Sequence, residues 1–126
     1  MPLSNKTILL YDVDNVVNEC IEELKLDVEL VYGILFSLAG GDEIRNGANV
    51  SFYEGSFDEL ISDIKNYEDD AFYSPLVEYL EESNKCWNNL LIEDKIVIVY
   101  SIKQWMRKNL LLDENLDPKI MITFNW

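Results

Sequence analysis

The chain has 126 residues, of which 48% are apolar and 12% aromatic, with only five glycines and three prolines. This composition excludes a disordered or low-complexity chain and fits one globular domain over residues 1–126 with a single core. The net charge of −14, from 24 acidic and 10 basic residues, excludes electrostatic attraction to nucleic acid or to an anionic membrane.

The first predicted helix covers residues 7–25. Acids occupy one side of this helix. The apolar residues recur every three or four positions on the other side, as in one face of an amphipathic helix: Leu10, Val13, Val17, Cys20 and Leu24. A strand over residues 7–12 is the alternative. A second helix, apolar nearly all round, is expected over residues 27–39 and should end at Gly40-Gly41.

A short strand is predicted over residues 47–55, which are β-branched and aromatic between glycines. Ser56 then resembles a helix N-cap, with Glu59 completing a capping box. The helix that follows should turn four apolar side chains inward: Phe57, Leu60, Ile61 and Ile64. A further helix is expected to begin at Ser74-Pro75, with the proline in its first turn.

Residues 94–112 are predicted to form a long helix, because apolar residues keep a helical spacing over the whole stretch: Ile92, Ile96, Val99, Ile102, Met106 and Leu110. A buried strand over residues 94–101 is the alternative. Residues 119–125 alternate strictly and predict a strand that pairs with residues 49–54. The expected fold is therefore α+β and mainly α-helical, a compact multi-helix domain with a small β-sheet.

The sequence Asp12-x-Asp14 after an apolar run resembles the start of haloacid-dehalogenase-like phosphatases, in which two aspartates serve a magnesium ion. In that family Gly and Thr follow, whereas this chain has Asn15 and Val16. No recognisable pattern positions a phosphate-binding lysine. The helical interpretation, in which both aspartates lie in a solvated helix turn, is preferred.

Other catalytic patterns are missing from the sequence. The chain has no histidine, which excludes Ser-His-Asp and Cys-His arrangements and most zinc sites. Cys20 and Cys86 are isolated and form neither a disulfide framework nor a metal-ligand spacing. The N-terminal sequence does not match a secretory signal, and no apolar stretch is long enough to span a bilayer. We expect a cytoplasmic protein that is not an enzyme and needs no cofactor or metal.

The acidic residues gather in two segments. Residues 12–29 hold seven acids against Lys25, and residues 54–82 hold ten acids against Lys65, a net of −9. The second segment interleaves its acids with tyrosines, which anchor many protein interfaces. Its predicted partner-binding residues are Glu54, Asp58, Asp63, Tyr67, Glu68, Asp69, Asp70, Tyr73, Glu78, Tyr79 and Glu82. The alternatives are a face that only keeps the protein soluble and tyrosines that are half-buried in the core.

In size, segregated acidity and lack of a catalytic set, the chain resembles bacterial immunity proteins of contact-dependent growth inhibition and other polymorphic toxin systems. The resemblance is one of general character across the chain, and no motif is matched. It implies tight one-to-one binding of a basic cognate toxin domain, expected to be a nuclease, by covering its active or substrate-binding surface. A nucleic-acid mimic, such as an antirestriction or anti-CRISPR protein, is the alternative, and the phosphatase using Asp12 and Asp14 is the second alternative.

Overall fold

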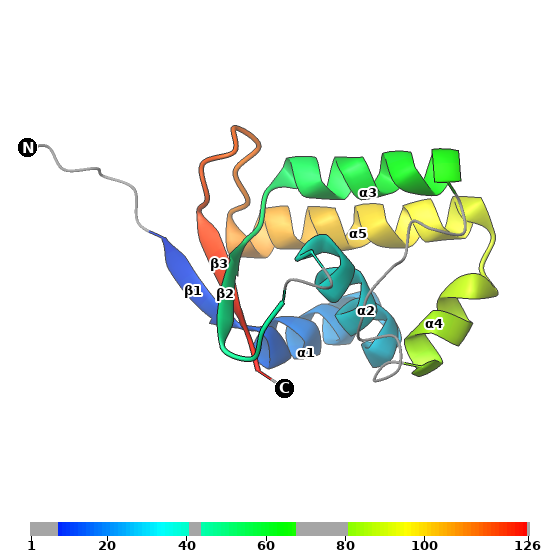
Figure 1. The fold of residues 1–126 in the computed structure, drawn as a ribbon, viewed down its shortest axis with the longest axis horizontal. Helices are drawn as coiled ribbons and strands as arrows, with labels where there is room; N and C mark the ends of the chain where they lie inside the picture. The colour runs from blue at the N-terminus through cyan, green and yellow to red at the C-terminus, as the bar shows by residue number, and fades with distance from the viewer. Residues whose placement is uncertain (1–7, 41–43, 68–80, 126) are drawn as a thin grey trace, which may run out of the picture.

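The computed structural model describes residues 8–40, 44–67 and 81–125, with only the backbone described at residues 67 and 81–84. Helices dominate this part of the chain, and a small sheet lies at one end of the molecule (Figure 1). The elements in chain order are β1 (Leu9–Asp12), α1 (Val13–Leu24), α2 (Val28–Leu38), β2 (Ala48–Ser51), α3 (Glu54–Tyr67), α4 (Glu81–Asn88), α5 (Ile92–Leu110) and β3 (Ile120–Phe124). The predicted α+β, mainly helical class is confirmed.

The sheet has the strand order β1-β3-β2. Strand β3 runs antiparallel to β2, with Val50 opposite Ile122, which confirms the pairing predicted from the sequence. Alternate residues of β3 are fully buried against the helices: Ile120, Ile122 and Phe124. On its other side β3 pairs with β1 in parallel, with Tyr11 opposite Ile122. The last strand of the chain is therefore the centre of the sheet.

The predicted helix over residues 7–25 is wrong at its start. Residues Leu9–Asp12 form β1, as the alternative proposed, and the helix begins only at Val13. The backbone N–H of Leu9 donates to the carbonyl of Lys119 at 3.0 Å, so a partner more than 100 residues away in the sequence determines this segment. Leu10, which the helical pattern placed on the buried face, is exposed. From Val13 onward the predicted stripe is correct.

Helices α2 and α5 confirm their predictions. Asp27 caps α2 by accepting from the N–H groups of Glu29 and Leu30, and Gly40 follows the helix with a φ of 104°. The ambiguous residues 94–101 lie inside α5, which runs to Leu110. Most of the predicted apolar positions in α5 are buried: Val99, Ile102, Met106 and Leu110.

Helix α3 begins earlier than expected. Its first residue is Glu54, and the N–H of Ser56 donates to the Tyr53 carbonyl at 3.2 Å, so the capping box of Ser56 and Glu59 does not form the start of the helix. The inward residues are as predicted, with Phe57, Leu60 and Ile64 buried and Ile61 half-buried. The helix predicted from Ser74-Pro75 begins outside the described residues.

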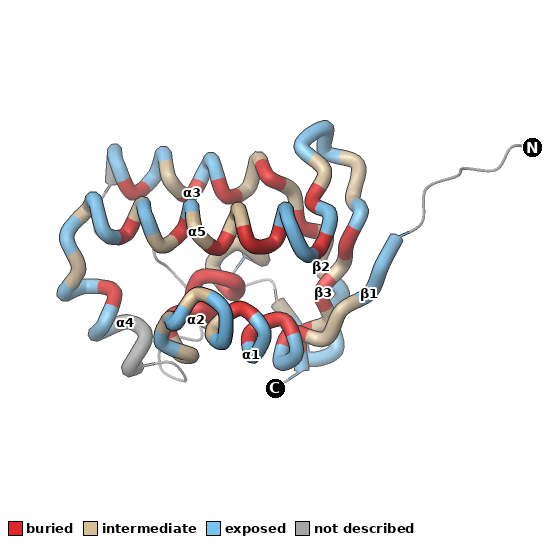
Figure 2. Tube along the Cα trace, turned by 180° about the vertical axis from the view of Figure 1, so that it is seen from behind, coloured by how far each residue is buried: buried red, intermediate tan, exposed pale blue. Residues whose placement is uncertain are grey.

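Helix α5 lies between two other helices. It packs along α3 on one side and approaches α1 on the other, and its buried residues alternate with exposed ones along the side seen in Figure 2. Helices α2 and α4 pack against each other near Trp87, which is fully buried. This arrangement places an acidic helix on each side of α5.

Candidate protein-binding site

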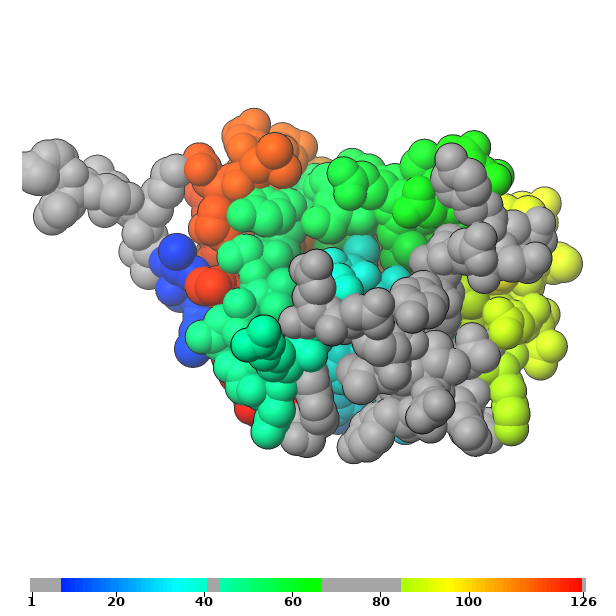
Figure 3. Space-filling view, in the orientation of Figure 1, coloured from blue at the N-terminus to red at the C-terminus, as the bar shows by residue number. Residues whose placement is uncertain are grey.

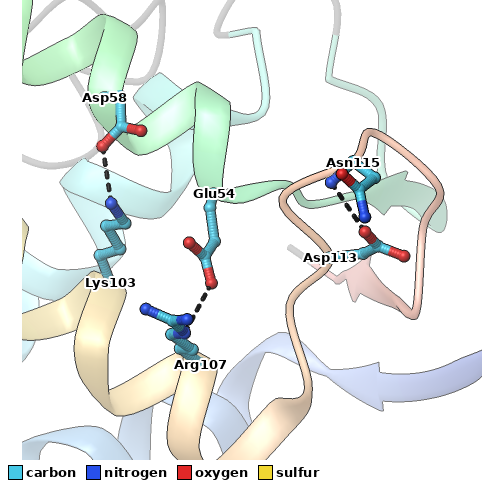
Figure 4. Close-up of polar contacts among 6 residues, drawn as sticks. All are labelled: Glu54, Asp58, Lys103, Arg107, Asp113 and Asn115. Carbon is cyan, nitrogen blue, oxygen red and sulfur yellow. Dashed lines mark hydrogen bonds and ion pairs between the residues drawn. The ribbon is translucent and has the colours of Figure 1, made fainter.

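The described part of the predicted binding segment begins with two carboxylates that face α5. Glu54 is only 4% exposed, and its Oε1 lies 3.0 Å from Nε of Arg107. Asp58 accepts a hydrogen bond from Nζ of Lys103 at 2.7 Å (Figure 4). Both acids thus meet a cation of their own chain, and the burial of Glu54 removes it from the set of carboxylates open to a partner.

The outer side of α3 carries the free acids of this helix. Glu59 and Asp63 are exposed, stand four residues apart and line a shallow depression of about 150 Å³ together with Ser37 and Leu38 at the end of α2. Neither acid forms an ion pair with another residue of the described chain. Asp63 is one of the predicted partner-binding residues, whereas Glu59 was expected only to complete a helix cap.

The rest of the predicted binding residues lie beyond what the structure describes. Tyr67 is the last residue of α3 and Glu82 belongs to α4, but the side chains of both are undescribed. The others fall outside the described residues: Glu68, Asp69, Asp70, Tyr73, Glu78 and Tyr79.

A polar pocket of about 210 Å³ lies where α3 begins, against the loop that precedes β3. Figure 3 shows this loop, in orange, beside the start of α3, in green, and Figure 4 shows polar side chains that line the pocket. Glu54 and Arg107 line one side of it. On the other side, Asp113 accepts from the N–H of Asn115 at 2.8 Å, and its second oxygen lies 4.0 Å from Nζ of Lys119. The Glu54–Arg107 pair joins α3 to α5, and the Asp113–Lys119 pair joins two residues of the loop. Glu114, which also lines the pocket, forms no ion pair within the described residues.

Sequence reasoning missed a groove between α1 and α5. Two adjoining depressions of about 400 and 340 Å³ share Glu23 and Trp105 as lining residues. The α1 side adds Glu19, Glu22 and Leu24, and the α5 side adds Tyr100, Ser101, Gln104, Lys108 and Asn109. The spacing of Glu19, Glu22 and Glu23 in the sequence predicts that they share one helix face. The local sequence does not predict that this face lies beside α5.

Trp105 forms the floor of this groove. Its ring is 5% exposed, and its Nε1–H donates to Oε2 of Glu23 at 2.6 Å. Cys20, one turn before Glu23, points into the core, and burial followed by the charge of Glu23 raises the pKa of its thiol to about 12. Glu19 and Glu22 form no ion pair within the described chain. The groove therefore joins an aromatic floor to uncompensated carboxylates.

The Asp12-x-Asp14 pair lies where β1 passes into α1, and both carboxylates have partners inside the protein. Asp12 caps α1 by accepting from the N–H of Asp14 at 2.9 Å, and its other oxygen accepts from Nδ2 of Asn125 at 2.6 Å. Asp14 accepts from the hydroxyl of Tyr32, and burial followed by this hydrogen bond raises the pKa of Tyr32. These contacts link the sheet, α1 and α2.

Two further kinds of feature are absent from the described residues. They contain no group of three or more His, Cys, Asp or Glu side chains able to hold a metal ion. None of the helices in the described ranges combines the length and apolar character that crossing a bilayer requires. Comparison with models of known protein families, with curated proteins and with solved structures gave no match.

Proposed function

We propose that this protein is an acidic binding partner that neutralises a basic protein domain, as immunity proteins neutralise the toxins of contact-dependent and polymorphic toxin systems. The partner would be the basic catalytic domain of a cognate toxin, a nuclease, in the cytoplasm. The protein would act by covering the active or substrate-binding surface of that domain, without a cofactor or chemistry of its own.

One observation carries the proposal: four exposed carboxylates on α1 and α3 form no ion pair with a cation of the described residues. Glu19 and Glu22 on α1, and Glu59 and Asp63 on α3, form no ion pair within the described residues. Such unpaired charge produces a negative field that attracts a basic surface and accelerates association, toward about 10⁸ M⁻¹s⁻¹ at low ionic strength. Charge needed only for solubility has no reason to concentrate on particular faces.

The test first asks whether a toxin gene lies beside the gene for this protein, and then uses the catalytic domain which that neighbour encodes. Cells that express this domain should survive when the present chain is co-expressed. The purified pair should associate at a rate that falls steeply between low salt and about 0.15 M, where screening over about 8 Å sets in. Replacing Glu59→Gln and Asp63→Asn together should slow association and reduce the salt dependence.

The matched control is Glu93→Gln with Asp94→Asn, which removes the same charge from the exposed first turn of α5. It should change the association rate much less. Neutralising Asp69 and Asp70 extends the comparison to the part of the acidic segment outside the described residues. Equal association rates and salt slopes for the Glu59/Asp63 and control variants would assign these acids to solubility, and loss of protection by the wild-type chain would contradict the function itself.

The position of Asp12 favours a second candidate, a magnesium-dependent phosphatase, because this aspartate ends a strand as that chemistry requires. A nucleophilic role would have to release Asp12 from the α1 cap and from Asn125. Turnover of p-nitrophenyl phosphate that needs Mg²⁺ and disappears in Asp12→Asn would establish this candidate. Absence of turnover, with wild-type protection in Asp12→Asn, would reject it.

A further inference from the structure

The groove between α1 and α5 has a composition that selects a particular occupant. Its α5 half carries two aromatic side chains, Tyr100, which is 51% exposed, and Trp105 below it, among four polar residues: Ser101, Gln104, Lys108 and Asn109. Leu24 of α1 adds an aliphatic side chain to the same depression. Exposed aromatic and aliphatic side chains on a monomer, gathered beside one depression, are typical of interaction sites.

The α1 half of the groove supplies the charge. Glu19, Glu22 and Glu23 line it within about one helical turn of each other, against the single cation Lys108 among the lining residues. Glu23 is held in place by the indole N–H of Trp105, while Glu19 and Glu22 have no ion pair within the described chain. An occupant that brings positive charge to this side gains both attraction and hydrogen bonds.

From this geometry we infer that the groove binds a basic amphipathic segment of the partner protein, with an arginine between the α1 carboxylates and an apolar side chain on Leu24, Tyr100 and Trp105. The inference rests on the proposed function and names the site that anchors the partner. Arginine suits the groove better than lysine, because its planar guanidinium forms paired hydrogen bonds with carboxylates and stacks on aromatic rings.

A second copy of this chain fits the groove poorly. Each copy carries a net charge of −14, and both would bring the same acidic helix to the contact. The basic segment of another protein matches both the charge of the α1 side and the aromatic floor of the groove.

The probe is a synthetic amphipathic peptide of roughly 15 residues with leucines on one face and arginines on the other. A second peptide has citrulline in place of each arginine, which keeps the shape and removes the charge. Binding is followed by NMR through the indole N–H of Trp105, assigned with Trp105→Phe, with the buried Trp87 as an internal reference. The arginine peptide should shift the Trp105 signal, and the citrulline peptide should bind at least about tenfold more weakly.

Two protein variants separate the groove from the general field of the protein. Glu19→Gln with Glu22→Gln should weaken the arginine peptide about tenfold, whereas Glu93→Gln with Asp94→Asn, an equal loss of charge at the far end of α5, should weaken it less than about twofold. Equal weakening by both variants, equal affinity of both peptides, or an unshifted Trp105 signal would overturn the inference. Concentration-dependent shifts of Trp105 without peptide would also overturn it, because they would make a second copy the occupant.

The toxin assay separates failure of this inference from failure of the proposed function. Full protection and unchanged toxin affinity in Glu19→Gln with Glu22→Gln would overturn the groove as the anchor and leave the function standing. Specific binding of the arginine peptide in the groove, with no protection by the wild-type chain, would overturn the toxin function alone.

Discussion

Helix α5 has an acidic helix on each side, and the carboxylates on these two sides differ in their partners. Toward α3, Lys103 and Arg107 neutralise Asp58 and Glu54 within the protein. Toward α1, the indole N–H of Trp105 donates to Glu23, and the neighbouring Glu19 and Glu22 form no ion pair within the described residues. Acidic residues of two similar helices can therefore stabilise the fold on the α3 side of α5 and remain available to a partner on the α1 side.

The ion pair between the buried Glu54 and the exposed Arg107 should give the largest effect on stability. Arg107→Met leaves the carboxylate of Glu54 buried without a counter-charge, and we expect the free energy of unfolding to fall by about 3 kcal/mol. Urea denaturation followed by circular dichroism measures it. Combining Arg107→Met with Glu54→Leu should recover most of the loss, since an apolar pair replaces the ionic one. If Arg107→Met alone were as stable as the wild type, water would solvate Glu54. The carboxylates toward α3 would then not differ from those toward α1.

On the α1 side only Glu23 should matter for stability. Glu23→Ala deprives the indole N–H of Trp105 of its charged acceptor and should cost about 2 kcal/mol, measured in the same denaturation experiment. The control is Glu22→Ala, whose carboxylate has no ion pair in the described chain and whose loss should stay within about 0.5 kcal/mol. Equal losses in the two variants would mean that Trp105 does not depend on Glu23.

The burial of Cys20 on the inner side of α1 should make the free energy of unfolding depend on pH in the alkaline range. Burial and Glu23 raise the pKa of this thiol from 9.0 to about 12, so the folded protein keeps a proton that the unfolded chain releases above pH 9. The free energy of unfolding should therefore fall as pH rises through this window, by about 1.4 kcal/mol at pH 10 relative to pH 7 for the thiol alone. Tyr32, with its raised pKa, adds to the fall at higher pH in the same direction.

Cys20→Ala supplies the control for the pH experiment, because it should remove the part of the slope that begins near pH 9. Alkylation with iodoacetamide gives an independent check: the exposed Cys86 should react in the folded protein and the buried Cys20 should not. Equal reactivity of the two thiols would show that the inner face of α1 is open to solvent.

The cap at the start of α1 should give a smaller effect. Asp12→Ala removes the acceptor for the Asp14 N–H and for Asn125, at an expected cost of about 1 kcal/mol in the free energy of unfolding. Asp12→Asn should cost much less, because asparagine caps helices almost as well as aspartate. The same large loss in both variants would mean that the negative charge of Asp12, and not its hydrogen bonds, stabilises this end of the helix.

The exposed carboxylates should give the smallest effects. The side chain of Asp58 is 60% exposed, and Asp58→Asn, which breaks its ion pair with Lys103, should cost about 0.5 kcal/mol in the free energy of unfolding. Glu19→Gln with Glu22→Gln should leave the thermal midpoint unchanged or slightly raised, since it relieves repulsion on a protein of net charge −14. A clear loss of stability in the second variant would show that these glutamates serve the fold, and they would cease to be binding candidates.

The sequence by itself determined the elements whose side chains repeat over a long stretch. The helical spacing from Ile92 to Leu110 and the alternation from Ile120 to Phe124 arise because each element buries one face in the core. These patterns can be recognised from neighbouring residues alone. The same holds for the segregation of acids, which depends on composition alone. The α+β class and the pairing of β2 with β3 followed from these local patterns.

Only the tertiary structure decided the short elements and the partners of the charges. Leu9–Asp12 is a strand because β3, at the other end of the chain, offers it hydrogen bonds, and no local period contains that information. Glu54 and Glu19 look alike in the sequence, yet one is buried on Arg107 and the other lies open beside Trp105. That difference arises because packing brings distant residues of α5 to each carboxylate, and the strength of a charge interaction depends on distance and burial, which the order of residues does not specify.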